Sequence, residues 1–493
     1  MADRLSDATL GRLPAGVARP AYDRGALATG IVHLGIGAFH RAHMAAYTDA
    51  VLAGGDARWG ILGASLRSPD TRDALQPQDG LYALAVRDAE GERLQVVGSV
   101  TRLLVAPENP EALLQAMSAP ETRIVSLTVT EKGYCHAPAT GELDERHPDV
   151  VHDLAHPGTP RSAPGFIVEA LRRRRAAGLP FFTALCCDNL PHNGATLRRV
   201  LVRFAALRDP ALAEALAQDL RCPSTMVDRI VPATTDRDRA GIAEALGLAD
   251  AWPIATEPFT QWVIEDDFAL GRPAWDRAGA TFVADVAPFE LAKLRMLNGS
   301  HSTLAYLGYL AGHETVADTM AAPGFAALVR GLMLEEAAPT LPPVPGLDVA
   351  AYAEQLVARF RNPALRHRTW QIAMDGTQKL PQRLLGTVRD RLAAGGAIDR
   401  LALGVAAWIR YATGRDEAGG AIDLRDPLAD ELRRRTAGLE DAAAIADSLL
   451  GLDAVFGRDL PADQRFTRAV SAALAGLMRE GAAATVARFG VPR

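Results

Sequence analysis

The stretch GIVHLGIGAFHRAHMAAYTDAVLAGG, residues 30–55, decides the expected fold. It begins as a short apolar run, passes through a turn that contains Gly35 and Gly37, and continues as an amphipathic stretch of helical length until glycines end it. That order predicts a strand, a tight turn and a helix. Further short strand-like runs, at 58–66, 123–133, 180–189 and 280–288, alternate with helical stretches. Such alternation predicts an α/β fold with a parallel, doubly wound sheet.

The turn itself, GIGAFH, carries the first two glycines of the dinucleotide fingerprint, with His40 where the third glycine would stand. One glycine permits the turn, and the second lets the backbone approach a pyrophosphate. A glycine-rich turn without a nucleotide is the alternative. His40 and His43 have a spacing that a metal could use, but no acidic or cysteine partner stands close in the sequence, so no metal site is predicted. The candidate cofactor contacts are Gly35, Ile36, Gly37, Ala38, Phe39, His40 and Arg41.

The end of the second predicted strand bears on which nucleotide would bind. An acidic residue is expected there to hold the adenosine 2′-hydroxyl, but the sequence ASLRSPD places Arg67 and Ser68 at that point. By the general rule for such folds, an arginine here favours NADP.

Composition indicates a globular protein, and a length of 493 residues is typical of about two to four domains. Long Leu/Ala/Arg stretches predominate after Pro288, so we expect a Rossmann-type dinucleotide-binding domain over 1–285 and a mostly α-helical domain over 286–493. The formal net charge of −6 argues against a nucleic-acid partner. No apolar run has the length of a membrane span, and the first residues lack the apolar core of a signal peptide, so we expect a cytoplasmic protein with no membrane partner. A monomer is expected, with a small homo-oligomer as the alternative.

Lysine is rare in this chain. The sequence has 53 Lys plus Arg, of which only Lys132, Lys293 and Lys379 are lysine. A lysine loses its proton when burial or a nearby cation destabilises the charge, whereas arginine does not, so a retained lysine suggests amine chemistry. A biased composition that left three lysines behind is the alternative.

The stretch ELAKLRMLNGSH, residues 290–301, surrounds Lys293 with other polar groups. On a helix that starts near Pro288, the side chains of Glu290, Lys293, Asn298 and His301 would lie within a face of about 140°. A neutral lysine beside a nicotinamide could take a hydroxyl proton as hydride leaves the same carbon, and asparagine amides could hold the developing alkoxide. Asn189 lies at the expected carboxyl end of a strand, where open α/β sheets bind ligands.

The segments GIGAFHRAH, TEKGYC, CDN, VDRIVP and KLRMLNGSH together resemble the mannitol dehydrogenase family of polyol-specific long-chain dehydrogenases. The resemblance implies a zinc-independent, NAD-dependent enzyme with a Rossmann-type domain and a helical domain. It also implies residue roles: Lys293 as general base, Asn189 and Asn298 as holders of the alkoxide, His301 as a ligand of a substrate hydroxyl, Glu290 as a proton relay, Glu131 and Asp228 near the nicotinamide, and Lys379 as a substrate-binding lysine. Lys132 receives no role.

One position separates branches of that family. Where mannitol-acting relatives place an arginine, this chain has Gln371, and the segment LRHRTWQIAMDGTQKLPQRLL is most similar to the fructuronate reductase (mannonate oxidoreductase) branch. If one helix runs through this segment, Arg368, Gln371 and Lys379 share a face that could hold a carboxylate. We therefore expect an enzyme that interconverts fructuronate and mannonate, with mannitol 2-dehydrogenase as the alternative. The resemblance favours NAD and Arg67 favours NADP; we expect NAD.

Two other classes of protein use the same residues differently. A Schiff-base lyase would use Lys293 as a nucleophile, although the nucleotide turn argues against it. A non-catalytic nucleotide sensor would need no base and would tolerate arginine at that position.

Overall fold

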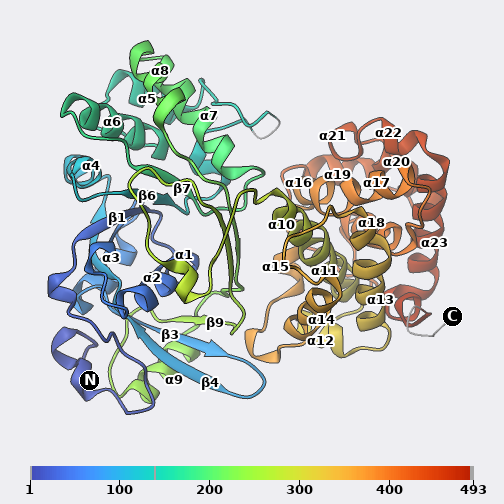
Figure 1. Ribbon diagram of the computed structural model, residues 1–493. Helices are drawn as coiled ribbons and strands as arrows, with labels where there is room; N and C mark the ends of the chain where they lie inside the picture. Colours follow the sequence, from blue (N-terminus) through green and yellow to red (C-terminus); the bar gives the residue numbers. More distant parts are fainter. Residues whose placement is uncertain (1–2, 138–139, 489–493) are drawn as a thin grey trace. The chain divides into compact units, whose positions relative to one another are not determined.

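A computed structural model describes residues 3–137 and 140–488, and the chain divides into two units, Met1–Val286 and Ala287–Arg493 (Figure 1). The first unit contains the strands and the second is helical, which confirms the predicted fold class.

The main sheet of the N-terminal unit has five parallel strands in the order β5-β2-β1-β6-β7. The strand order reverses between β1 and β6, and ligands of open α/β sheets bind beyond the carboxyl ends of the strands at such a switch point. Here those ends lead into Gly35 and Thr128. The strands are β1 (Thr29–Leu34), β2 (Gly60–Ser65), β5 (Val100–Val105), β6 (Ile124–Leu127) and β7 (Thr183–Cys186).

Alternate residues of these strands enter two different cores, as the two-residue period of a strand requires. Val32 of β1 and Val125 of β6 pack with helices α4, α6, α7 and α8 on one face. Their neighbours Ile31 and Ile124 pack on the other face with α2 and the aromatic residues of the smaller sheets. In Figure 1, α6, α7 and α8 lie on one side of the sheet and α2 lies on the other. The further helices of this unit are α3 (Asp70–Leu75), α4 (Pro110–Ser118), α5 (Pro148–Ala155), α6 (Ala163–Ala176), α7 (Asn193–Ala206), α8 (Pro210–Asp219) and α9 (Asp236–Leu246).

Two small sheets lie outside the doubly wound sheet. One has the order β4-β3-β9, with an antiparallel β3–β4 pair, and the other has the order β11-β10-β8, with an antiparallel β8–β10 pair. Their strands are β3 (Tyr82–Arg87), β4 (Glu92–Val97), β8 (Thr225–Asp228), β9 (Ile254–Thr256), β10 (Gln261–Glu265) and β11 (Thr281–Val283).

The helix predicted after the glycine turn is interrupted. It forms α1 (Ala38–Ala42) and α2 (Met44–Leu52), separated by His43, whose φ of −117° and ψ of −94° are not helical. The ring of His43 contacts Phe39, Tyr47 and Trp262, and its Nε2 lies 3.0 Å from the carbonyl oxygen of Gln261. These contacts hold the break in the core.

The C-terminal unit is built around α11, α18 and α23, which pack on one another and share one apolar core. A π-helical segment, Lys293–Asn298, joins α10 to α11. The helices are α10 (Ala287–Ala292), α11 (Gly299–Leu310), α12 (Val316–Ala321), α13 (Phe325–Gly331), α14 (Val349–Phe360), α15 (Thr369–Ala373), α16 (Gly376–Leu380), α17 (Gly386–Ala393), α18 (Asp399–Ala412), α19 (Ala429–Thr436), α20 (Ala442–Leu450), α21 (Asp453–Phe456), α22 (Asp459–Ala462) and α23 (Gln464–Ala487).

Candidate functional site

The glycine turn follows β1 directly, and its first glycine is required by the fold. Gly35 has a φ of +89°, and a Cβ at this position would lie 2.2 Å from the carbonyl oxygen of Thr128. Its amide donates to the carbonyl oxygen of Ala64 at 2.8 Å. The turn is therefore held between β2 and the loop after β6.

The second glycine, Gly37, is not required by any contact within the described part of the chain. Its φ is −82°, which other residues adopt, and a Cβ there would meet only the carbonyl oxygen of Gly35, at 3.9 Å. Open space in front of a glycine backbone at a switch point is the geometry that a closely approaching pyrophosphate needs. The residues present thus fit a dinucleotide.

His40 stacks on a second buried histidine at the base of this turn. The rings of His33 and His40 are 3.4 Å apart at 16°, and both are fully buried. The nitrogens of His33 lie 2.8 Å from the hydroxyls of Ser126 and Thr128. Burial lowers the pKa of His33 to about 3 and that of His40 well below its usual value, so the stack is neutral at pH 7. The stack links the turn to β6.

The other predicted residues of the turn have mixed surroundings. Ile36 is 2% exposed and packs so closely that a Cβ on Gly63 would lie 2.4 Å from its Cδ1. Ala38 and Phe39 are half-buried. Arg41 is buried, donates to the carbonyl oxygen of Trp252 at 2.7 Å and lies over the ring of Tyr82. These contacts give Arg41 a packing role in the core.

Arg67 is exposed in the loop between β2 and α3. Beside it, the hydroxyl of Ser68 donates to Asp70 at 2.9 Å. The carboxyl end of β2 thus presents an arginine where an acid would grip the ribose of NAD.

The loops after β6 and β7 carry Glu131 and Asn189, both exposed. Glu131 begins a 3₁₀ turn, Glu131–Tyr134, which follows Thr130 with a φ of +63°. Sequence reasoning missed Asp188, which organises both loops: its carboxylate accepts from the amide of Val129 at 2.8 Å and the hydroxyl of Tyr134 at 2.7 Å. Burial raises its pKa. The signal was present in the quoted CDN segment, in which only the asparagine was considered.

Asp228 ends β8 and is buried, 5% exposed, opposite Gln261 of β10. Its strand is fixed to the end of β7 by Asn193, whose amide donates to the carbonyl oxygen of Thr225 and accepts from its amide, both at 2.9 Å. Asn193 also donates to the carbonyl oxygen of Asp188 at 3.1 Å. The loop that carries Glu131 and the strand that ends at Asp228 are therefore connected through Asp188 and Asn193.

In the C-terminal unit, Lys293 begins the π-helical segment that Asn298 ends. The regular helix assumed from the sequence is therefore wrong here. Because π-helical hydrogen bonds join residues five apart, Asn298 lies above Lys293 rather than about 140° around the helix. Lys293 is 7% exposed and Glu290 is half-buried. π-helical turns often mark functional sites.

His301 follows in the first turn of α11 and is 8% exposed. Its ring stacks on Phe360 at 5.4 Å and meets the edge of His367 at 4.8 Å. Sequence reasoning missed His367 and Arg383, although both stand in the segment quoted for the mannonate oxidoreductase branch.

The helical face predicted for Arg368, Gln371 and Lys379 does not exist, because the helix ends at Ala373 and restarts at Gly376 after Asp375, whose φ is +56°. Arg368 is exposed and pairs with Glu314 at 3.7 Å, and Gln371 is exposed. Lys379 donates to the carbonyl oxygens of Met374 and Ile372 at 2.6 and 3.3 Å, so it caps the end of α15.

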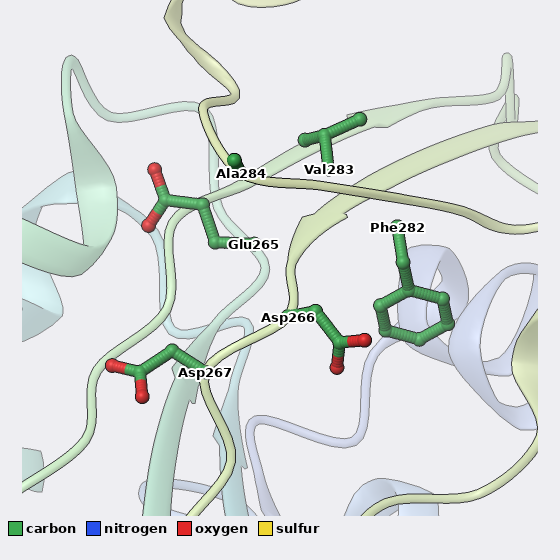
Figure 2. Close-up of a pocket in the computed structure, with 6 residues that line it drawn as sticks. All are labelled: Glu265, Asp266, Asp267, Phe282, Val283 and Ala284. Carbon is green, nitrogen blue, oxygen red and sulfur yellow. The ribbon is translucent and has the colours of Figure 1, made fainter.

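A surface pocket of about 530 Å³ at the ends of β10 and β11 contains none of the predicted site residues. Figure 2 shows that its three carboxylates point in different directions. They also have partners: Asp266 pairs with Arg272 at 2.7 Å, and Glu265 accepts from the amide of Ser224 at 2.7 Å. Across residues 3–137 and 140–488, no group of three His, Cys, Asp or Glu side chains could hold a metal ion.

A doubly wound sheet with a glycine turn at its switch point defines a dinucleotide-binding protein of the dehydrogenase type. Residues 29–277 match the mannitol dehydrogenase Rossmann domain and residues 285–478 the mannitol dehydrogenase C-terminal domain. The chain belongs to the mannitol dehydrogenase family, whose members are oxidoreductases.

Similar proteins cover nearly the whole chain. A D-mannonate oxidoreductase of Escherichia coli (strain K12) is 51% identical over 96% of this chain and 98% of its own. A mannitol 2-dehydrogenase of Phaeosphaeria nodorum is 42% identical over 99% of this chain and 85% of its own. The structure of Pseudomonas fluorescens mannitol 2-dehydrogenase in ternary complex with NAD and D-mannitol is 41% identical, covers 98% of this chain and 99% of its own, and superposes with a TM-score of 0.89.

Helices long and apolar enough to span a bilayer are absent from the part of the chain that the structure describes.

Proposed function

We propose that this protein is an NAD-dependent oxidoreductase that interconverts a keto sugar acid and its hydroxy acid, fructuronate and mannonate, with Lys293 as the acid/base. The observation that carries the proposal is the 51% identity to a D-mannonate oxidoreductase along nearly the whole of both chains.

The residues around the glycine turn support the cofactor assignment. Gly37 leaves room for a pyrophosphate, and Gly35 with the His33–His40 stack fixes the turn that would hold it. We place Glu131 and Asp228 near the nicotinamide, and Arg67 near the adenosine. Bound NAD supplies the acceptor for the hydride that leaves the substrate carbon.

The C-terminal unit supplies the proton chemistry in this proposal. Lys293, which is 7% exposed, would take the proton of the reacting hydroxyl at Nζ. Asn298, above it in the π-helical segment, would donate its amide to the developing alkoxide. Glu290, one turn before, would pass the proton on to water.

The remaining proposed roles concern the substrate. Asn189 would share the alkoxide-holding role of Asn298, His301 would bind a substrate hydroxyl, and Lys379 would lie at the substrate. Mannitol 2-dehydrogenase activity is the second candidate, favoured by the 42% identity to one such enzyme and by the TM-score of 0.89 to another.

An absorbance assay of reduced nicotinamide tests the proposal directly. The purified protein is given fructuronate or fructose with NADH and NADPH, and mannonate or mannitol with NAD and NADP. We expect the acids to react faster than the neutral sugars at equal concentration, with NAD(H) preferred. Turnover of mannitol and fructose alone would assign the second candidate function instead.

A further inference from the structure

His367, which has no role in the proposed reaction so far, lies against His301 in the C-terminal unit. The two rings are 4.8 Å apart at 71°, an edge-to-face contact, and Phe360 covers His301 on another side at 5.4 Å. The side chain of Phe360 is 2% exposed. His301 is therefore held between an aromatic ring and a second imidazole.

One ring nitrogen of each histidine is left without a hydrogen bond. Nε2 of His301 and Nδ1 of His367 are buried and have no partner among the described residues. Buried polar atoms are almost always paired, and leaving one unpaired is costly. Two such atoms on touching rings indicate a place that a ligand fills.

The charge around this pair favours an anion. Burial lowers the pKa of His301 well below its usual value, and the charged or titratable groups that lower it further are His367, Arg383, Arg359 and Lys379. Burial, followed by the charge of Lys379, lowers the pKa of His367 to about 4. Both rings are thus neutral in positive surroundings, and a neutral imidazole donates a hydrogen bond from one of its two nitrogens.

The fold fixes each of these groups. The carbonyl oxygen of His367 accepts from the amide of Val316 at 2.9 Å, and the next residue forms a β-bridge with Thr315. Arg383 donates to the hydroxyl of Ser302, next to His301, at 3.0 Å. The backbone of Arg383 approaches so closely that a Cβ on Gly299 would lie 2.7 Å from its carbonyl oxygen.

We propose that His367 is a specificity-determining residue: its Nδ1 donates a hydrogen bond to the terminal carboxylate of the sugar acid, whose charge Arg383 and Lys379 balance, while His301 beside it holds a hydroxyl of the same substrate. The inference rests on the proposed function. It assigns recognition of the carboxylate to His367 instead of Arg368 and Gln371, which are exposed. A neutral polyol has a hydroxyl in place of this carboxylate, so its hydrogen bonds to these groups are weaker than those of the charged carboxylate.

The experiment compares the wild-type protein with His367→Phe, which keeps a ring of similar size and removes both nitrogens. kcat/KM is measured for fructuronate and for fructose, and the binding of mannonate is measured by calorimetry without turnover. We expect His367→Phe to lower kcat/KM for fructuronate about ten- to hundred-fold, to weaken mannonate binding by a similar factor, and to change fructose less than about threefold.

Two further variants guard against a merely structural effect. His313→Phe changes a histidine of the same unit that packs on Phe325, and it should leave both substrates unaffected. His367→Asn keeps an amide donor and should retain part of the preference for the acid, which also covers the case in which His367→Phe fails to fold.

The outcomes separate this inference from the proposed function. If the wild-type protein does not prefer the acids, the proposed substrate is wrong and the inference falls with it. If the wild-type protein prefers the acids but His367→Phe and His367→Asn keep that preference in full, the inference alone is overturned. Equal loss for fructuronate and fructose would show that His367 only supports the fold.

Discussion

Replacing the two glycines of the turn one at a time separates folding from cofactor binding. Gly35→Ala forces a Cβ into a φ of +89° and to within 2.2 Å of the carbonyl oxygen of Thr128. The left-handed conformation alone costs about 1–2 kcal/mol, and the overlap adds to it. Gly37→Ala meets no atom closer than 3.9 Å at an ordinary φ, so the free energy of unfolding should change by no more than about 0.5 kcal/mol.

Gly37→Ala should weaken the binding of the cofactor although it hardly changes the stability of the fold. An added Cβ occupies the space that the pyrophosphate needs, so Gly37→Ala should weaken NADH binding by at least about tenfold, or about 1.4 kcal/mol. Thermal unfolding gives the stability of each variant, and fluorescence titration with NADH gives the dissociation constant. Wild-type affinity of Gly37→Ala for NADH, or wild-type stability of Gly35→Ala, would contradict these expectations.

Three further predictions concern Lys293, the choice between NADH and NADPH, and Glu169. Lys293→Ala should lower kcat by about 10²- to 10⁴-fold, whereas titration should still show NADH binding. The control Lys132→Ala, at an exposed lysine, should leave kcat unchanged. Near-normal turnover of Lys293→Ala would show that Lys293 is not the acid/base. NADH should bind several-fold more tightly than NADPH, and Arg67→Ala should increase this difference in affinity. If direct titration of the wild-type protein shows tighter binding of NADPH, the cofactor is NADP rather than NAD. Glu169 is buried, and burial opposes its ionisation, but hydrogen bonds from Arg172, Arg173 and Arg208 hold its pKa at about 2. The ionised Glu169 therefore stabilises the fold fully above pH 4.5, and this contribution is lost as the pH falls towards 2. Glu169→Gln should cost about 2–3 kcal/mol in chemical denaturation at pH 7 and less at pH 3, whereas an equal cost at both pH values would contradict the sign.

The fold could be predicted because its signals are local. Apolar runs of strand length, with glycines at their ends and helical stretches between them, specify a parallel sheet by period alone. The break at His43 could not be predicted, because it depends on contacts with Trp262 and Gln261, which come from a distant strand. The small sheets likewise combine β3 with β9, far apart in the chain.

The candidate site was predictable in its residue types and less so in its geometry. Lys293 is conspicuous because lysine is rare, yet the π-helical segment that aligns it with Asn298 does not follow from a regular helical period. The break at Asp375 removed the face assumed for Arg368 and Lys379. Tertiary packing decides such details: the segment before α15 bonds to Val316 and brings the ring of His367 against that of His301, which a local pattern does not predict.

The wild-type ratio of kcat/KM for fructuronate to that for fructose, measured with NADH in one preparation, is the decisive test of the sugar-acid assignment. A charge-assisted contact to a carboxylate contributes about 1.5–3 kcal/mol, so the ratio should be at least about ten and reach about a hundred. A ratio below one, with mannitol also oxidised faster than mannonate, would contradict the sugar-acid assignment and establish a polyol dehydrogenase in its place.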